Sequence, residues 1–163
     1  MAGKTGKTGR PGKIEKRLAE LGITLPSPPA PVANYVPAVR AGKLLFCSGQ
    51  VSASPGGKAI KGKLGAVVSL ELGQEAAKIC AINLLAQAKA ALGSLDKIKR
   101  CVRLGGFINA LPSYGPLPQV MNGASDLMVA VLGDAGRHAR TTLGVAQLPL
   151  DAAVEVEAVF EIR

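Results

Sequence analysis

Hydrophobic side chains recur at helical spacing in some stretches of the sequence and alternate with polar ones in others. The strongest helical pattern spans residues 74–92, where small and aliphatic side chains form one wide apolar face. The clearest alternation spans residues 152–162, where apolar residues occupy one face and three glutamates the other. On these criteria we expect helices over residues 13–21, 74–92 and 119–132, and strands over residues 36–40, 43–51, 97–109, 138–147 and 152–162.

The order of these elements predicts an α+β fold. Residues 36–162 follow a β-β-α-β-α-β-β pattern, in which two long helices cover one face of a mixed sheet to form a sandwich. The second face of the sheet then lacks a cover. Because closed symmetric homo-oligomers are a common way to bury such a face, we expect it to pack against other subunits.

The length and the local composition predict one domain with a short extension. A chain of 163 residues fits a single domain. The N-terminal end is made of Gly, Thr, Pro and basic residues, which cannot build a core, so we interpret residues 1–12 as a flexible basic tail. Residues 13–163 then form the domain, and its first part, residues 13–31, is a short helix followed by a proline-rich arm.

Net charge and composition limit the possible binding partners and the cellular location of the protein. The net charge is +9, and the basic tail could contact a polyanion such as RNA. Aromatic residues that could stack on bases are not interleaved with the basic ones, so we expect no nucleic-acid partner, although an RNA-acting protein stays an alternative. No run of apolar residues has the length of a signal peptide or a membrane span, which predicts a cytoplasmic protein without a membrane partner.

The metal-ligating and redox-active residues are few. One histidine and three scattered cysteines do not supply a usual zinc site, so we expect no metal. The odd, unclustered cysteine count argues against a disulfide framework. We therefore expect Cys47, Cys80 and Cys101 to be reduced and buried as small hydrophobic side chains.

Charged residues near the C-terminus are the first candidates for chemistry. Glu155 and Glu157 lie on one face of the last predicted strand, and Arg137 and Arg140 belong to the strand before it, near enough to pair with them. One interpretation is an exposed ion pair of little energetic value. The other is an arginine that binds a carboxylate beside a glutamate that handles a proton or a water molecule. The residues alone leave both interpretations open.

Two longer motifs resemble the signatures of a known family. Residues 35–50 read YVPAVRAGKLLFCSGQ, and residues 138–158 read HARTTLGVAQLPLDAAVEVEA. Together they resemble the N-terminal and C-terminal signatures of the Rid/YjgF family, the reactive-intermediate deaminases, whose older description is endoribonuclease of the perchloric-acid-soluble type. The resemblance covers about residues 32–163, and the additional helix near the N-terminus indicates a divergent branch.

The resemblance implies a chorismate-mutase-like fold, a homotrimer with clefts between subunits, and no metal or organic cofactor. The implied reaction is hydrolysis of small 2-enamine or 2-imino acids to 2-keto acids and ammonia. Position by position, Arg140 matches the arginine that holds the substrate carboxylate, Glu155 matches the carboxylate that positions water and moves a proton, and Tyr35 supplies a cleft hydroxyl. The implied substrate-binding residues are Ser48, Gly49, Thr142 and Asn122. A non-catalytic metabolite-binding or regulatory trimer that uses the same cleft stays the main alternative.

Overall fold

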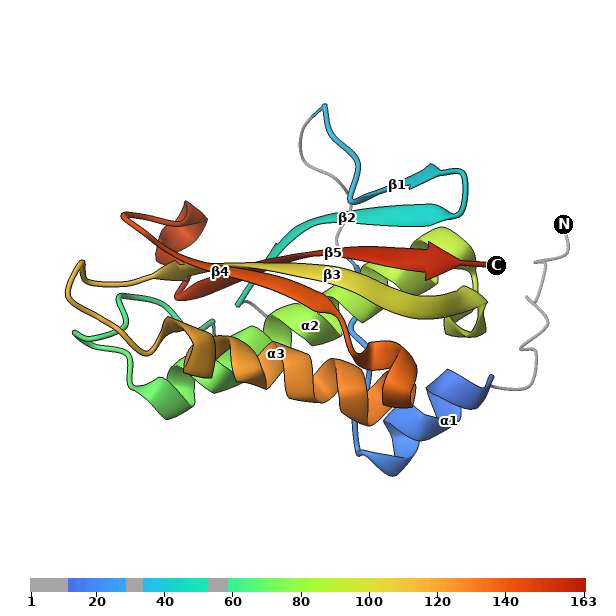
Figure 1. The fold of residues 1–163 in the computed structure, drawn as a ribbon, viewed down its shortest axis with the longest axis horizontal. Coiled ribbons are helices and arrows are strands. Elements are labelled where there is room, and N and C mark those ends of the chain that lie inside the picture. The colour runs from blue at the N-terminus through green and yellow to red at the C-terminus, as the bar shows by residue number, and fades with distance from the viewer. Residues whose placement is uncertain (1–11, 29–33, 53–58) are drawn as a thin grey trace, which may run out of the picture.

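The fold has one mixed sheet with its two long helices on one face (Figure 1). The computed structural model describes residues 12–28, 34–52 and 59–163. Most of the predicted tail and part of the proline-rich arm lie outside the described residues. The helices are α1 (Lys13–Glu20), α2 (Leu70–Leu92) and α3 (Leu117–Leu132), and the strands are β1 (Ala38–Ala41), β2 (Leu44–Val51), β3 (Ile98–Asn109), β4 (Ala139–Val145) and β5 (Val154–Ile162). The predicted β-β-α-β-α-β-β order is confirmed, with α1 placed before it.

Helix α2 forms where the alanine-rich pattern predicted it and begins one turn earlier. The Oγ of Ser69 accepts a hydrogen bond of 3.2 Å from the backbone N–H of Leu72, which caps the first turn. The helix ends at Gly93, which adopts the left-handed conformation with φ of +78°. Small buried residues such as Ala77 and Cys80 let α2 pack closely against β2 and β5.

The strand order in the sheet is β1-β2-β5-β3-β4. Strands β3 and β4 run parallel, and the remaining neighbours are antiparallel. The alternation predicted for β5 is confirmed, since its apolar side chains are buried on the helix side of the sheet. Strand β4 is therefore an edge strand, and β3 separates it from β5.

The pattern predicted for β3 is wrong in its details. From the sequence, the first half of residues 97–109 is interpreted as a strand in which charged and apolar residues alternate, and the pair Gly105 and Gly106 favours a bulge or bend. The irregularities instead occur earlier, between Ile98 and Arg100 and between Cys101 and Arg103. They shift the phase, so that Cys101 is buried on the same side as Leu104, and both glycines pair in regular register with β4 and β5.

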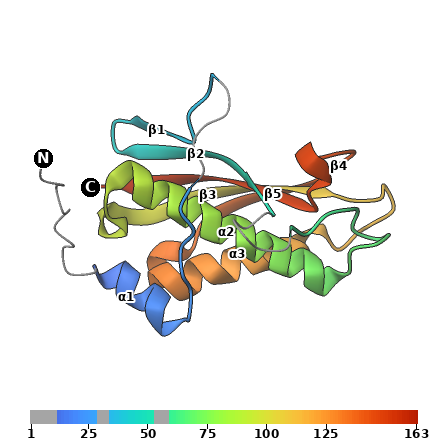
Figure 2. The same ribbon diagram turned by 180° about the vertical axis from the view of Figure 1, so that it is seen from behind.

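The face of the sheet opposite the helices has no cover within the described chain, as the pattern predicted. Val39, Phe46 and Leu143 are about half exposed there, on β1, β2 and β4. Figure 2 shows the same layering from behind, with all three helices on one side of the sheet. Half-exposed apolar side chains of this size on an uncovered sheet face are typical of a surface that binds another protein chain.

The three cysteines are buried, as the sequence analysis predicted. Cys47, Cys80 and Cys101 are all buried and free. Burial raises the pKa of Cys47 and of Cys101 to about 12, so these thiols stay protonated at neutral pH. In the part of the chain that the structure describes, none of the helices has the length and hydropathy needed to cross a bilayer.

Candidate functional site

Of the candidate residues near the N-terminus, Gly49 lies against Glu155 of β5, and Ser48 is its neighbour in β2. Ser48 and Gly49 lie at the irregularity in β2, and Val51, two residues further on, pairs with Glu155 of β5. The Oγ of Ser48 donates to the backbone oxygen of Val36, and its N–H donates to that of Pro37, both at 2.9 Å. These two bonds attach the segment that carries Tyr35 to β2. The Tyr35 side chain is itself more than half exposed.

The absence of a side chain at Gly49 makes room for the Glu155 carboxylate. A Cβ atom at Gly49 would stand only 2.0 Å from Oε1 of Glu155 and 2.8 Å from its Cδ. The carboxylate therefore lies directly against the backbone of β2. Partial burial there, with a smaller effect from the charge of Glu157, raises the pKa of Glu155 above its usual value. A carboxyl group with a raised pKa is suited to accept and return a proton near neutral pH.

The neighbouring glutamates form ion pairs, though not with the arginines that the sequence suggested. Glu157 pairs with Arg103 of β3 at 2.9 Å, and Glu161 pairs with Lys99 at 2.6 Å. The expected pairing with Arg137 or Arg140 is wrong, because β3 lies between β4 and β5. Among the described residues of β5, Glu155 is the glutamate that forms no ion pair.

The remaining candidate residues form a second group at the edge of the sheet, beside α3. The Nη1 of Arg140 donates to Oδ1 of Asn122 at 3.0 Å and to Oγ of Ser125 at 3.1 Å. Asn122 and Ser125 are three residues apart on α3 and so share one face of the helix. Thr142 lies two residues after Arg140 on β4 and therefore points to the same side of the sheet.

The guanidinium of Arg140 keeps a free edge. The hydrogen bonds to Asn122 and Ser125 both start from Nη1, which has only two hydrogens to donate. Within the described residues, Nε–H and the Nη2 hydrogens have no hydrogen-bond acceptor. These donors form the planar fork that matches the two oxygens of a carboxylate.

The two groups are too far apart to act on one small molecule within a single chain. Leu104 pairs with both Arg140 and Ala158, and Glu155 lies three residues from Ala158 along β5. With strands about 4.8 Å apart and a rise of about 3.4 Å per residue, the Cα atoms of Arg140 and Glu155 are about 14 Å apart. Their side chains also lie on opposite faces, since Arg140 contacts α3 and Glu155 does not. One protomer thus presents two half-sites.

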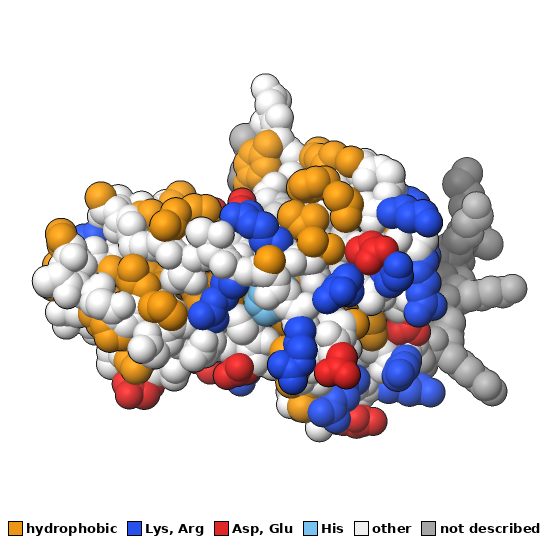
Figure 3. Space-filling view, viewed as in Figure 1, with side chains coloured by type: hydrophobic (Ala, Val, Ile, Leu, Met, Phe, Trp, Pro, Cys, Tyr) orange, Lys and Arg blue, Asp and Glu red, His pale blue; other side chains and the backbone are white. Residues whose placement is uncertain are grey.

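Two members of this arrangement were not among the candidates from sequence. Ser125 contacts Arg140, and it also lies 3.0 Å from Nε2 of His138, the single histidine of the chain. In Figure 3 the one pale blue side chain, that of the single histidine, lies among the blue Lys and Arg side chains. The spacing of Ser125 three residues after Asn122 was the one available signal, because it places both on one helix face.

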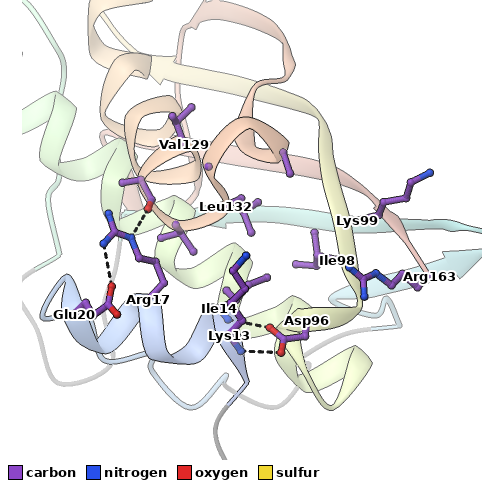
Figure 4. Close-up of a pocket in the computed structure, with 14 residues that line it drawn as sticks. Lys13, Ile14, Arg17, Glu20, Asp96, Ile98, Lys99, Val129, Leu132 and Arg163 are labelled. Atoms are coloured by element: carbon purple, nitrogen blue, oxygen red, sulfur yellow. Dashed lines mark hydrogen bonds and ion pairs between the residues drawn. The ribbon is translucent and has the colours of Figure 1, made fainter.

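A separate hollow of about 630 Å³ lies where α1 meets α3 and the start of β3 (Figure 4). Its polar groups bind one another. The Asp96 carboxylate accepts the backbone N–H groups of Lys13 and Ile14 at 2.8 and 2.9 Å, and Arg17 bonds to Glu20 and to the carbonyl oxygen of Ala130. The bonds to Asp96 and Ala130 therefore fix α1 against the rest of the domain. Across residues 12–28, 34–52 and 59–163, no group of three or more His, Cys, Asp or Glu side chains is arranged to hold a metal ion.

Comparisons with known proteins agree with the arrangement of the elements. The family model described as "YjgF/chorismate mutase-like, putative endoribonuclease" matches residues 15–162. Protein TCP17 of Trypanosoma cruzi is 47% identical over 153 residues, which are 93% of this chain and 96% of that protein. Such identity over nearly the whole length of both chains indicates the same domain throughout.

Solved structures give the same result. Protein Atu1372 of Agrobacterium tumefaciens, whose function is unknown, is 48% identical with a TM-score of 0.86, and 92% of each chain is covered. A "putative endoribonuclease" of Shewanella oneidensis is 34% identical with a TM-score of 0.88, over 93% of this chain and all of that one. RidA of an Antarctic Psychrobacter is 26% identical with a TM-score of 0.58, over 83% of this chain and 94% of that one. The first two structures therefore share more of this chain's geometry than RidA does.

Proposed function

The chain belongs to the YjgF/chorismate-mutase-like family, and from that membership we propose that it is a hydrolytic deaminase of small 2-imino acids. The products would be a 2-keto acid and ammonia. The proposal includes a homotrimer in which each cleft combines the Arg140 group of one subunit with the Glu155 group of its neighbour. It needs no metal and no organic cofactor.

The observation that carries the proposal is the division of the candidate residues into two half-sites. A 2-imino acid of four carbons is far shorter than the distance of about 14 Å between Arg140 and Glu155 in one chain. The uncovered face of the sheet, on which Val39, Phe46 and Leu143 are half exposed, offers a surface on which copies of the chain could associate. Bringing the edge of one copy to the open face of another would complete the cleft.

The chemistry follows from the two groups. The free Nε and Nη2 donors of Arg140 bind the substrate carboxylate and fix the position of C2. Glu155 takes a proton from a water molecule as the water oxygen attacks C2 of the protonated imine, which gives a tetrahedral amino alcohol. The carboxyl then returns that proton to the amine nitrogen. The C2–N bond breaks as the hydroxyl gives its proton to the Glu155 carboxylate and becomes the carbonyl. Ammonia leaves and takes up that proton, which restores the ionised carboxylate.

A coupled assay tests the proposal directly. A threonine dehydratase generates 2-iminobutanoate, and the formation of 2-ketobutyrate is followed with and without the protein. We expect the wild-type protein to accelerate ketone formation and Arg140→Ala to abolish the acceleration while its oligomeric state is unchanged. Equal acceleration by Arg140→Ala would contradict the role of this arginine. Binding of 2-ketobutyrate without any acceleration would favour the non-catalytic alternative.

A further inference from the structure

A short chain of hydrogen bonds lies behind Arg140, on the side away from its free edge. Asn122 and Ser125 both accept from Nη1 of Arg140, and Ser125 in turn contacts Nε2 of His138 at 3.0 Å. The other ring nitrogen, Nδ1, lies 2.6 Å from the backbone oxygen of Gly136. The histidine is half buried and the loop before β4 fixes its position.

The direction of each bond in this chain can be assigned from the groups involved. The carbonyl oxygen of Gly136 can only accept, so Nδ1 of His138 carries a proton. In the neutral ring Nε2 is then an acceptor, and the hydroxyl of Ser125 donates its one proton to it. The lone pairs of the Ser125 oxygen are therefore turned toward the guanidinium of Arg140.

We propose that Ser125 and His138 are positioning residues that orient Arg140 for substrate binding. His138 fixes the rotation of the Ser125 hydroxyl, and the hydroxyl oxygen, together with Asn122, occupies both hydrogens of Nη1. The guanidinium plane is thereby held so that its Nε and Nη2 edge faces the cleft. Neither residue touches the substrate. This inference rests on the proposed function, because it gives the arginine of that site its support.

Removal of Ser125 or His138 should weaken carboxylate binding by a moderate factor. Loss of one hydrogen bond to a charged donor, with the second bond from Asn122 retained, is expected to weaken carboxylate binding about five-fold. Because His138 acts only through Ser125, its removal should cost nothing further once the hydroxyl is gone. Such strong non-additivity is typical of residues in one hydrogen-bond network.

A double-mutant cycle tests this coupling. The dissociation constant for 2-ketobutyrate is measured by calorimetry for wild type, Ser125→Ala, His138→Ala and the double variant, with oligomeric state and melting temperature as folding controls. We expect each single variant, and also the double variant, to bind about five-fold more weakly. Ser125→Thr keeps the hydroxyl and should bind within two-fold of wild type, about the resolution of such a measurement. Ser113→Ala, at an exposed serine on the loop before α3, is the matched control and should bind as wild type does.

A spectroscopic measurement tests the same chain of bonds without any ligand. Since His138 is the only histidine, the imidazole nitrogens in a ¹⁵N spectrum of labelled protein need no further assignment to a residue. We expect a protonated Nδ1 and an unprotonated Nε2, and a shift of the Nε2 signal in Ser125→Ala. A protonated Nε2 in the neutral ring would overturn the proposal. So would a double-mutant cycle in which the losses of binding free energy from the two single variants add in the double variant. Failure to bind 2-ketobutyrate would count against the proposed function, and the ¹⁵N result then decides on the positioning chain by itself.

Discussion

Replacing Gly49 by alanine should disable the site while leaving the fold intact. A Cβ atom at this position would stand 2.0 Å from Oε1 of Glu155, whereas ordinary van der Waals contact begins near 3.4 Å. The carboxylate must therefore move by about 1.4 Å. Displacing a catalytic group by about 1 Å can cost about 100-fold in rate. We expect a loss of this size in kcat for imine hydrolysis.

The stability of the Gly49→Ala variant should change little. The obstructing atoms belong to the end of a flexible side chain, which can rotate away. Gly49 is not among the residues with positive φ, so alanine fits the backbone and restricts the unfolded chain, an effect of about 0.4–1 kcal/mol in favour of folding. For a chain of this length the melting temperature should stay within about 4 °C of wild type.

A matched control separates this effect from a general loss of function. Gly115 also has no positive φ, and a Cβ atom there would meet nothing within 4 Å. Gly115→Ala should keep full activity in the dehydratase-coupled assay. If Gly49→Ala, correctly folded and with an unchanged oligomeric state, hydrolyses the imine at the wild-type rate, the assignment of catalysis to Glu155 against the β2 backbone is wrong.

Three further results are expected. Arg140→Lys keeps the charge but loses the planar fork, so kcat/KM should fall by roughly 10- to 100-fold in the coupled assay; an unchanged value would argue against bidentate carboxylate binding. Burial and Glu157 raise the pKa of Glu155, so the stability linked to this group is complete below the unfolded pKa of about 4.3 and is lost as pH rises through the folded value. In urea titrations Glu155→Gln should therefore be more stable than wild type at neutral pH, with the advantage vanishing near pH 4, and the opposite trend would refute this. Asp96→Ala removes the acceptor of two N–H groups in the first turn of α1, which should cost about 1 kcal/mol and speed hydrogen exchange over residues 13–20 more than over α2.

Local patterns in the sequence predict most of the helices and strands. The alternation of apolar and acidic residues in β5 fixes which side of the strand is buried, and the caps Ser69 and Gly93 delimit α2. The irregularities in β3 were not visible, because the charged residues around Cys101 fit a strict alternation equally well. Where an extra residue is inserted in a strand depends on pairing with its neighbours, which a single strand's pattern does not contain.

The pairing of charged groups was harder to predict than their positions. Adjacency in sequence suggested that the strand carrying Arg140 would pair with β5, but β4 joins β3 in parallel at the edge. Arg140 consequently binds side chains of α3 instead of a glutamate. The order of the strands in the sheet arises from tertiary packing, so the two half-sites do not follow from sequence spacing. The same holds for the contact between the Ser125 hydroxyl and His138.

The most direct test of the account asks whether one cleft draws on two chains. Arg140→Ala and Glu155→Gln are each expected to be inactive, and the two variants carry different affinity tags. After co-expression, mixed oligomers are purified through both tags in sequence and assayed for 2-ketobutyrate formation.

In a random assembly of equal amounts, a cleft receives an intact Arg140 and an intact Glu155 from two neighbouring subunits in about one case in four. We therefore expect about a quarter of the wild-type activity in the unselected mixture, and at least that in the doubly tagged fraction. Confirmed mixed oligomers that remain inactive, beside an active wild type, would contradict the claim that the two half-sites meet between subunits.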